Sequence, residues 1–167
     1  ASWVIPVEPE GEVYRDHTVV LEGDRIAALT PTAKWQPPGK AGTETVLPEH
    51  VLIPGLVNAH THAAMSLFRG IADDRSLNEW LVNHIWPAES ACVDREFVRH
   101  GTQLAVAEML LGGTTCFNDM YFYPDETAAV AIEAGIRAMI GMIVINFPSK
   151  WASNANEYLH KGQSVYD

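Results

Sequence analysis

A mostly apolar run, VLIPGLVNAH, occupies residues 51–60 and constrains the fold of this chain more than any other segment. Strands that are buried on both faces of a parallel sheet have such near-continuous apolar runs, whereas half-buried strands alternate apolar and polar residues. We therefore expect a strand buried on both faces at residues 53–60. A parallel sheet also requires crossover connections between its strands, and these are usually helices.

Alternating strands and helices are predicted after this run. Further strands are predicted at residues 114–119, directly after Gly112 and Gly113, and at residues 136–146. Helices are expected where apolar residues recur at helical spacing, at 77–85, 97–111 and 125–134, and from about Asn156 onward. Gly112 and Gly113 would end the second of these helices, and Gly135 would end the third. Strands that alternate with helices predict crossover units and a parallel sheet in an α/β fold.

Residues 1–50 differ from the rest, because they contain short apolar runs separated by turn residues. A hairpin is expected around Gly23, between strands at 17–22 and 25–29. The chain therefore divides into a strand-rich beginning and a longer α/β part. An irregular connector is expected at residues 31–45, which contain Pro31, Pro37, Pro38, Gly39 and Gly42.

The composition excludes several classes of protein. With 47% hydrophobic and 19% charged residues the chain is globular, and its net charge of −10 does not suit a nucleic-acid-binding surface. The most apolar stretch, residues 139–147, is far shorter than the roughly 20 residues of a membrane span. Residues 1–10 do not resemble a signal peptide, and Cys92 and Cys116 form no disulfide scaffold. We therefore expect a cytoplasmic protein without a nucleic-acid or membrane partner.

His60 and His62 lie at the end of the predicted strand, the first as its last residue and the second two residues later. Because side chains alternate along a strand, both imidazoles project to the same side. Two imidazoles on one side can hold a borderline metal ion such as zinc. A His-x-His pair taken alone is a weak indication, because two histidines without a ligand role are the more common outcome. The surrounding motif changes this balance.

The segment IPGLVNAHTH at residues 53–62 resembles the first barrel strand of the amidohydrolase superfamily, which follows a small β-sandwich. Further similar segments are MSLFRG at 65–70, LNEWL at 77–81, WPAE at 86–89 and GGTT at 112–115. LNEWL and WPAE are similar to the subgroup that deaminates 5-methylthioadenosine and S-adenosylhomocysteine. The resemblance implies an α/β fold, the N-terminal portion of a metal-dependent (β/α)8 TIM barrel preceded by part of a small β-sandwich. Residues 1–50 would form an incomplete sandwich segment and residues 51–167 an incomplete barrel.

The resemblance also implies a reaction. A divalent metal ion, usually Zn2+, would be held by His60 and His62 and would lower the pKa of its bound water from about 15.7 to about 7. The resulting hydroxide would attack C6 of the adenine ring, and ammonia would leave. The remaining ligands, a histidine and an aspartate, and a proton-transferring glutamate are expected beyond Asp167, so no catalytic residue is assigned within the chain. Surface or packing roles are expected for the other histidines, His17, His50, His84, His100 and His160.

Glu89 is the next residue to which the resemblance gives a role, because its family counterpart holds sugar hydroxyls of the nucleoside. A carboxylate can accept hydrogen bonds from two vicinal hydroxyls. The alternative is a solvated glutamate near a helix start. Trp80 and Phe68 could flank the purine base, and aromatic residues in such a segment equally often serve packing alone. For Asp119, at the end of the second strand, we expect a structural hydrogen bond rather than a catalytic role.

The expected function is hydrolytic deamination of 5-methylthioadenosine or S-adenosylhomocysteine. A guanine deaminase or a triazine hydrolase of the same superfamily is one alternative. Glu89 would discriminate between them, because a free base or a triazine has no ribose to bind. A catalytically incomplete structural fragment is the other alternative, and the His60 and His62 pair argues against it. The expected partners are a nucleoside substrate, the remainder of the same polypeptide and further copies of the chain in a homo-oligomer.

Overall fold

A computed structural model describes residues 1–36 and 42–166, which divide into two compact units, Ala1–Pro54 and Gly55–Asp167. We refer to them as the N-terminal unit and the C-terminal unit. The assignment of these parts to an incomplete sandwich and an incomplete barrel stays a prediction. Residues 37–41 of the predicted connector, which include Pro37, Pro38 and Gly39, and Asp167 at the chain end lie outside the described residues.

The N-terminal unit contains a small three-stranded sheet. Its central strand β1 (Trp3–Val4) pairs antiparallel with β2 (Tyr14–Arg15) and parallel with β5 (Val51–Leu52). Strand β5 therefore belongs to this sheet, although its residues precede the predicted barrel strand directly. A 3-10 turn, η1 (Thr32–Lys34), precedes β5 in the sequence.

The second sheet of this unit is a hairpin of β3 (His17–Glu22) and β4 (Arg25–Pro31), which pair antiparallel. Gly23 in the connecting turn has φ 61°, in the left-handed region that glycine adopts without a steric penalty. The hairpin that was predicted around Gly23 is confirmed.

The C-terminal unit is built on a parallel sheet with the order β6, β7 and β8. These strands are β6 (Leu56–Thr61), β7 (Thr114–Met120) and β8 (Arg137–Gly141). Thr61 lies opposite Asp119, near the carboxyl ends of both strands. The parallel sheet that was predicted from alternating strands and helices is confirmed.

The predicted strand at 53–60 is shorter and more exposed than expected. It begins only at Leu56, because Pro54 has no N–H to donate to a strand ladder. The side chains of Leu56 and Val57 are 51% and 67% exposed. Among the described residues β6 is an edge strand that pairs only with β7. The prediction that this strand is buried on both faces is therefore wrong for the chain by itself.

The third strand is also shorter than the predicted range of 136–146. β8 pairs with β7, and the last pair of their ladder joins Met120 to Gly141. The chain turns toward the next helix after Met120, so β7 offers no backbone groups to residues 142–146. Strand pairing therefore ends at Gly141, although the apolar sequence continues and Ile143 and Ile145 pack against an apolar cluster.

Five helical segments connect β6 to β7: η2 (Ala63–Phe68), α1 (Leu77–Trp80), the π-helical turn η3 (Leu81–Ile85), α2 (Trp86–Cys92) and α3 (Arg95–Leu111). Helix α4 (Pro124–Ala134) joins β7 to β8, and α5 (Ala155–Tyr166) follows β8. The helices predicted at 97–111, at 125–134 and from about Asn156 are confirmed. None of the helices in the described part of the chain is long and apolar enough to cross a membrane.

The helix predicted at 77–85 continues to Cys92 through the π-helical turn. In this turn the N–H of Trp86 donates to the carbonyl of Leu81, five residues earlier. Pro87 follows directly, and proline lacks an N–H while its ring crowds the preceding turn of an α-helix. The wider turn therefore accommodates Pro87 without ending the helix.

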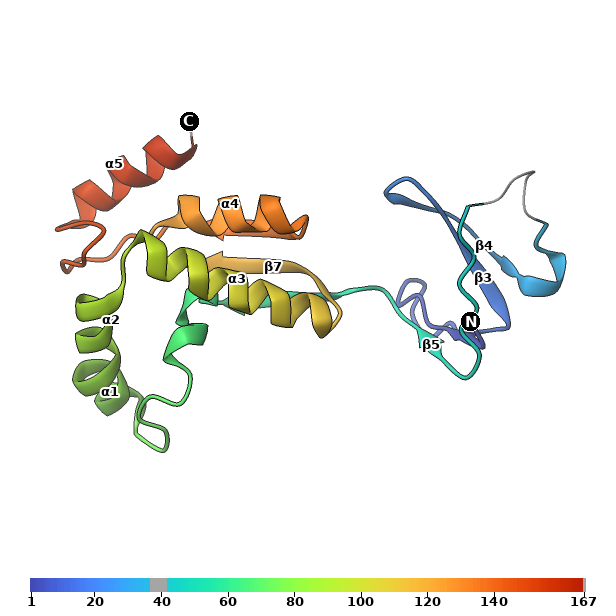
Figure 1. Ribbon diagram of the computed structural model, residues 1–167, viewed down its shortest axis with the longest axis horizontal. Coiled ribbons are helices and arrows are strands. Elements are labelled where there is room, and N and C mark those ends of the chain that lie inside the picture. Colours follow the sequence, from blue (N-terminus) through green and yellow to red (C-terminus); the bar gives the residue numbers. More distant parts are fainter. Residues whose placement is uncertain (37–41, 167) are drawn as a thin grey trace. The chain divides into compact units, whose positions relative to one another are not determined.

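Two apolar clusters hold the C-terminal unit together. One lies between the sheet and helices α3 and α4 around the fully buried Phe117, and Figure 1 shows both helices alongside β7. The other is built largely from residues that follow the carboxyl ends of the strands, together with residues of the helices. Its members include Ile85, Val98, Tyr121, Phe122, Trp151 and Tyr158. This second cluster packs at the carboxyl end of the parallel sheet, where His60 and His62 lie. We refer to this end as the strand edge.

Gly101 in α3 allows this helix to approach η2 closely. A Cβ atom at Gly101 would lie 2.3 Å from the carbonyl oxygen of Ala64. Because a backbone atom cannot move aside as a flexible side chain can, Gly101→Ala is expected to lower the free energy of unfolding by roughly 1–3 kcal/mol. Urea unfolding measures this change. Gly162→Ala is the control, since its Cβ would meet Met142 at an ordinary 3.4 Å. A Gly101→Ala protein as stable as the control would contradict the close approach.

Candidate active site

His60 and His62 lie together at the carboxyl end of β6. Their ring centroids are 5.1 Å apart and their ring planes meet at 78°. His62 is half-buried, and its Nδ1 donates a hydrogen bond to the backbone carbonyl of Met120, 2.5 Å away. Because a carbonyl can only accept, this contact assigns the ring proton to Nδ1 and leaves the Nε2 lone pair of His62 free to bind a metal ion.

Asp119 fixes the backbone directly after His62. Its side chain is 1% exposed, and its Oδ1 accepts a hydrogen bond from the N–H of Ala63 at 2.6 Å. This contact agrees with the structural hydrogen bond that was expected for Asp119. Burial raises the pKa of this carboxyl group, whereas the Ala63 N–H and the nearby His62 lower it. Its second oxygen, Oδ2, is buried without a hydrogen-bond partner in the described part of the chain.

The donors at this strand edge fit part of a divalent metal site. Imidazole is a ligand that zinc accepts, and His62 is oriented by a second hydrogen bond, as metal-bound histidines usually are. The buried carboxylate of Asp119 adds negative charge beside it. No three or more His, Cys, Asp or Glu side chains in residues 1–36 and 42–166 are grouped so that they could hold a metal. A four-coordinate ion would therefore need ligands in addition to His60 and His62.

Glu89 extends from α2 toward the same strand edge. Its Oε1 accepts a hydrogen bond from Tyr121 Oη at 2.7 Å. Burial raises the pKa of Glu89, whereas the Tyr121 hydroxyl and the nearby His62 lower it. Burial and the negative charge of Glu89 raise the pKa of Tyr121, so that the phenol stays a neutral donor. Glu89 is therefore a half-buried acceptor with a fixed partner, and not a fully solvated side chain.

A pocket that is open to solvent lies beside Glu89, with an empty volume of about 460 Å³. Much of its lining is aromatic: Trp86, Phe122, Tyr123, Phe147 and Trp151. The rings of Trp86 and Phe147 are 5.4 Å apart. The segment 147–151 had no predicted role, since only tertiary packing brings it beside α2. The aromatic residues at both of its ends were the available signal.

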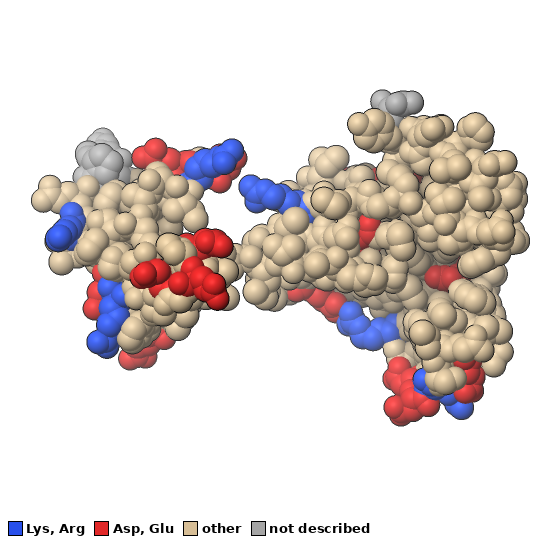
Figure 2. Space-filling model, turned by 180° about the vertical axis from the view of Figure 1, so that it is seen from behind, with Lys and Arg blue, Asp and Glu red and all other residues tan. Residues whose placement is uncertain are grey.

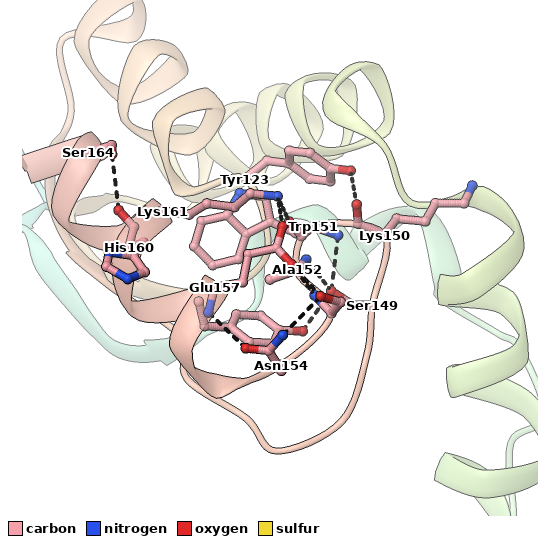
Figure 3. A network of polar contacts seen from close by, with 12 residues as sticks. Tyr123, Ser149, Lys150, Trp151, Ala152, Asn154, Glu157, His160, Lys161 and Ser164 are labelled. Atoms are coloured by element: carbon pink, nitrogen blue, oxygen red, sulfur yellow. Dashed lines mark hydrogen bonds and ion pairs between the residues drawn. The ribbon is translucent and has the colours of Figure 1, made fainter.

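Polar contacts hold this pocket wall against the start of α5, as Figure 3 shows. Ser149 Oγ accepts hydrogen bonds from Tyr158 Oη at 2.7 Å and from the N–H of Trp151 at 3.1 Å. The ammonium group of Lys161 donates to the carbonyl of Trp151. Tyr123 Oη contacts the neighbouring carbonyl, that of Lys150, at 3.2 Å. These contacts preform the wall before any ligand binds.

Trp80 and Phe68, the two aromatic residues considered as purine contacts, both pack in the structure. The indole N–H of Trp80 donates to the carbonyl of Ile71 at 3.2 Å, and the ring packs against the second apolar cluster. Phe68 is only 8% exposed, and its ring centroid lies 4.7 Å from that of Phe97. Phe68 is therefore a core residue, whereas Trp80 is half-buried.

Known proteins match this chain along its whole length. A curated relative from Saccharophagus degradans, named 5-methylthioadenosine/S-adenosylhomocysteine deaminase, is 50% identical over 167 residues, covering 100% of this chain and 37% of the relative. A 5′-deoxyadenosine deaminase from Methanothermobacter thermautotrophicus is 46% identical over 145 residues, covering 86% of this chain and 33% of the relative. The crystal structure of an adenosine deaminase from Xanthomonas campestris with bound zinc is 42% identical with a TM-score of 0.85, and the match covers 99% of this chain and 38% of that one.

The resemblance that was inferred from the sequence is thus confirmed. The chain spans about 37% of the length of the Saccharophagus degradans relative. The profile described as the Amidohydrolase family matches residues 51–165, which include the whole strand edge with His60, His62 and Glu89. The chain belongs to the amidohydrolase family.

Proposed function

We propose that this chain forms the first part of a metal-dependent deaminase that hydrolyses 5-methylthioadenosine or S-adenosylhomocysteine to the inosine analogue and ammonia. The observation that carries the proposal is the joint placement of His60, His62 and Glu89 at one strand edge. The similarity to proteins named as deaminases of adenosine and its 5′-modified analogues supports it.

The fold proposal concerns how the sheet continues. We propose that β6, β7 and β8 are the first three strands of a (β/α)8 barrel and that residues 1–50 belong to a small sandwich. The remainder of the same polypeptide would supply the other strands. The match to only about 37% of a curated relative and the exposed apolar side chains of Leu56 and Val57 support this arrangement.

In the proposed mechanism, His60 and His62 would hold the metal ion, for which Zn2+ is the first candidate. When bound, such an ion supplies Lewis-acid activation of water at neutral pH. The carbonyl of Met120 keeps the Nε2 of His62 available, and Asp119 holds the backbone after His62 in place. The other ligands and the proton-transferring residue are proposed to lie beyond Asp167.

Substrate binding is proposed for Glu89 and Trp80. The Glu89 carboxylate would accept hydrogen bonds from the 2′- and 3′-hydroxyls of the ribose, because it lies on the pocket wall while Tyr121 holds it. The indole N–H of Trp80 already donates to Ile71, so Trp80 would contact the base through its ring. A cytoplasmic location and a homo-oligomer remain proposals from the sequence.

The alternative of a guanine deaminase or a triazine hydrolase receives less support. Neither of those substrates carries a ribose, so the half-buried Glu89 beside the aromatic pocket would have no hydroxyls to bind. The alternative of a purely structural fragment leaves the free Nε2 of His62 without a role. Both alternatives predict that a change at Glu89 does not discriminate between nucleosides.

Glu89→Gln tests the proposed function in the complete protein. Its kcat/KM for ribonucleosides is expected to fall about ten- to a hundredfold, because a hydrogen bond to a charged group contributes roughly 1.5–3 kcal/mol. Turnover of 2′,3′-dideoxy analogues should change far less, since they have no hydroxyls at these positions. An ammonia-release assay with both substrates measures the difference.

The matched control for this test is Glu79→Gln in α1, where Glu79 pairs with Arg75 at the surface. Glu79→Gln should leave the ratio of the kcat/KM values for the two substrates unchanged. An equal fall in kcat/KM for both substrates in Glu89→Gln would refute the sugar-binding role.

A further inference from the structure

We propose that Tyr121 is a positioning residue, whose hydroxyl holds the Glu89 carboxylate in the orientation that receives the hydroxyls of a ribose. This inference rests on the proposed function and adds a residue that determines its specificity. It concerns a side chain that does not need to touch the substrate itself.

The geometry leaves Tyr121 little freedom. Its side chain is 4% exposed within the second apolar cluster, and its ring lies 5.0 Å from that of Phe122. The hydroxyl donates to Glu89 Oε1 at 2.7 Å, a length typical of a bond to a carboxylate. Because packing fixes the phenol ring of Tyr121, the hydrogen bond from its hydroxyl also fixes the position of Glu89 Oε1. Glu89 also lines the pocket, so its carboxylate can accept from a ligand at the same time.

The charges favour the same role. Burial raises the pKa of Glu89, so the ionised form needs a donor that compensates for lost water. Tyr121 supplies this donor and remains neutral, because burial and the Glu89 charge raise its own pKa. A solvated lysine or arginine in its place would neutralise the carboxylate and compete with ligand hydroxyls for it. A tyrosine leaves the negative charge available for a neutral sugar.

Tyr121 also connects the sugar acceptor to the candidate metal ligands. The residues at the end of β7 are consecutive, and each fixes a different group. Asp119 holds the N–H of Ala63, the carbonyl of Met120 holds His62, and Tyr121 holds Glu89. The rings of His62 and Tyr121 are 6.1 Å apart. One rigid strand end therefore sets the spacing between the metal ligands and the sugar acceptor.

The decisive variant is Tyr121→Phe in the complete protein, which removes one oxygen and keeps the packed ring. We expect its KM for a ribonucleoside to rise about tenfold with little change in kcat, as for the loss of a hydrogen bond to a charged group. The KM for the 2′,3′-dideoxy analogue should change by less than about threefold. In the double variant Tyr121→Phe/Glu89→Gln the losses should not add, because both changes remove the same interaction.

Tyr158→Phe is the matched control, since Tyr158 is a fully buried tyrosine that donates over the same 2.7 Å, to Ser149 instead of a carboxylate. A purely structural effect of losing a buried hydroxyl would affect both substrates equally in either variant. If Tyr121→Phe does not fold, the double variant replaces it, because Glu89→Gln leaves no ionised carboxylate unpaired. The double variant is then compared with Glu89→Gln alone, and equal selectivity is expected.

Two results would overturn the inference. One is an equal rise in KM for both substrates in Tyr121→Phe. The other is a double variant in which the effects of the two single changes on KM add. Failure of the proposed function gives a different result, since the unchanged protein would then release no ammonia from any adenine nucleoside. In that case the sugar-positioning role falls with it.

Discussion

Replacing both His60 and His62 with alanine is expected to remove bound metal and deaminase activity together from the complete protein. The two imidazoles are adjacent, and His62 is already oriented by the Met120 carbonyl for coordination through Nε2. Loss of a hydrogen bond around a metal ligand typically reduces affinity or activity about 10–100-fold, so loss of both ligands should reduce them further. Metal analysis and an ammonia-release assay on the same preparation measure the two effects.

Two exposed histidines provide the control for this experiment. His100 and His160 are exposed on α3 and α5, so a variant with alanine at both positions should keep its metal and its activity. Full metal occupancy in the His60→Ala/His62→Ala protein would show that the ion is held elsewhere. Lost activity with retained metal would likewise contradict the proposed ligand role.

The second large effect is expected when residues 1–167 are produced alone. A (β/α)8 barrel takes about 250 residues, whereas the C-terminal unit contributes three parallel strands. Its exposed apolar side chains include Leu56, Val57, Met120 and Met139, and Figure 2 shows a face of this unit with few charged side chains. This segment should therefore bind hydrophobic dyes, associate in solution and release no ammonia.

The comparison for this experiment is the complete protein, or the segment produced together with the remainder as a separate piece. Either should show cooperative unfolding and turnover. The prediction is wrong if the segment alone is a compact monomer that holds a metal through four ligands of its own. That result would also overturn the proposed barrel.

Local rules predicted the regular elements of this chain well. Gly135, which was predicted to end the third helix, ends α4 at φ 69°, in the left-handed conformation typical of helix ends. Such signals lie within a few residues of one another. The order of strands and helices, and with it the parallel sheet, followed from them.

Contacts between residues that are far apart in the sequence could not be predicted from local rules. The burial predicted for β6 depends on strands on both sides of it, and the described residues place only β7 beside it. The contact between Tyr121 and Glu89 joins residues 32 positions apart. A phenol and a carboxylate have no sequence spacing that predicts their pairing. Only the path of α2 back toward the end of β7 brings them together.

The π-helical turn at Leu81–Ile85 affects how this segment can change in evolution. A π turn holds an extra residue, so deleting one position there restores an ordinary α-helix. Because the π turn takes up this extra residue within one turn, the side chains after it would keep nearly the same direction on the restored helix. The glutamate that contacts Tyr121 would then stand one position earlier in the sequence. A gap of one position in an aligned relative therefore does not by itself remove this contact, since a glutamate shifted by one position can occupy the same place in space.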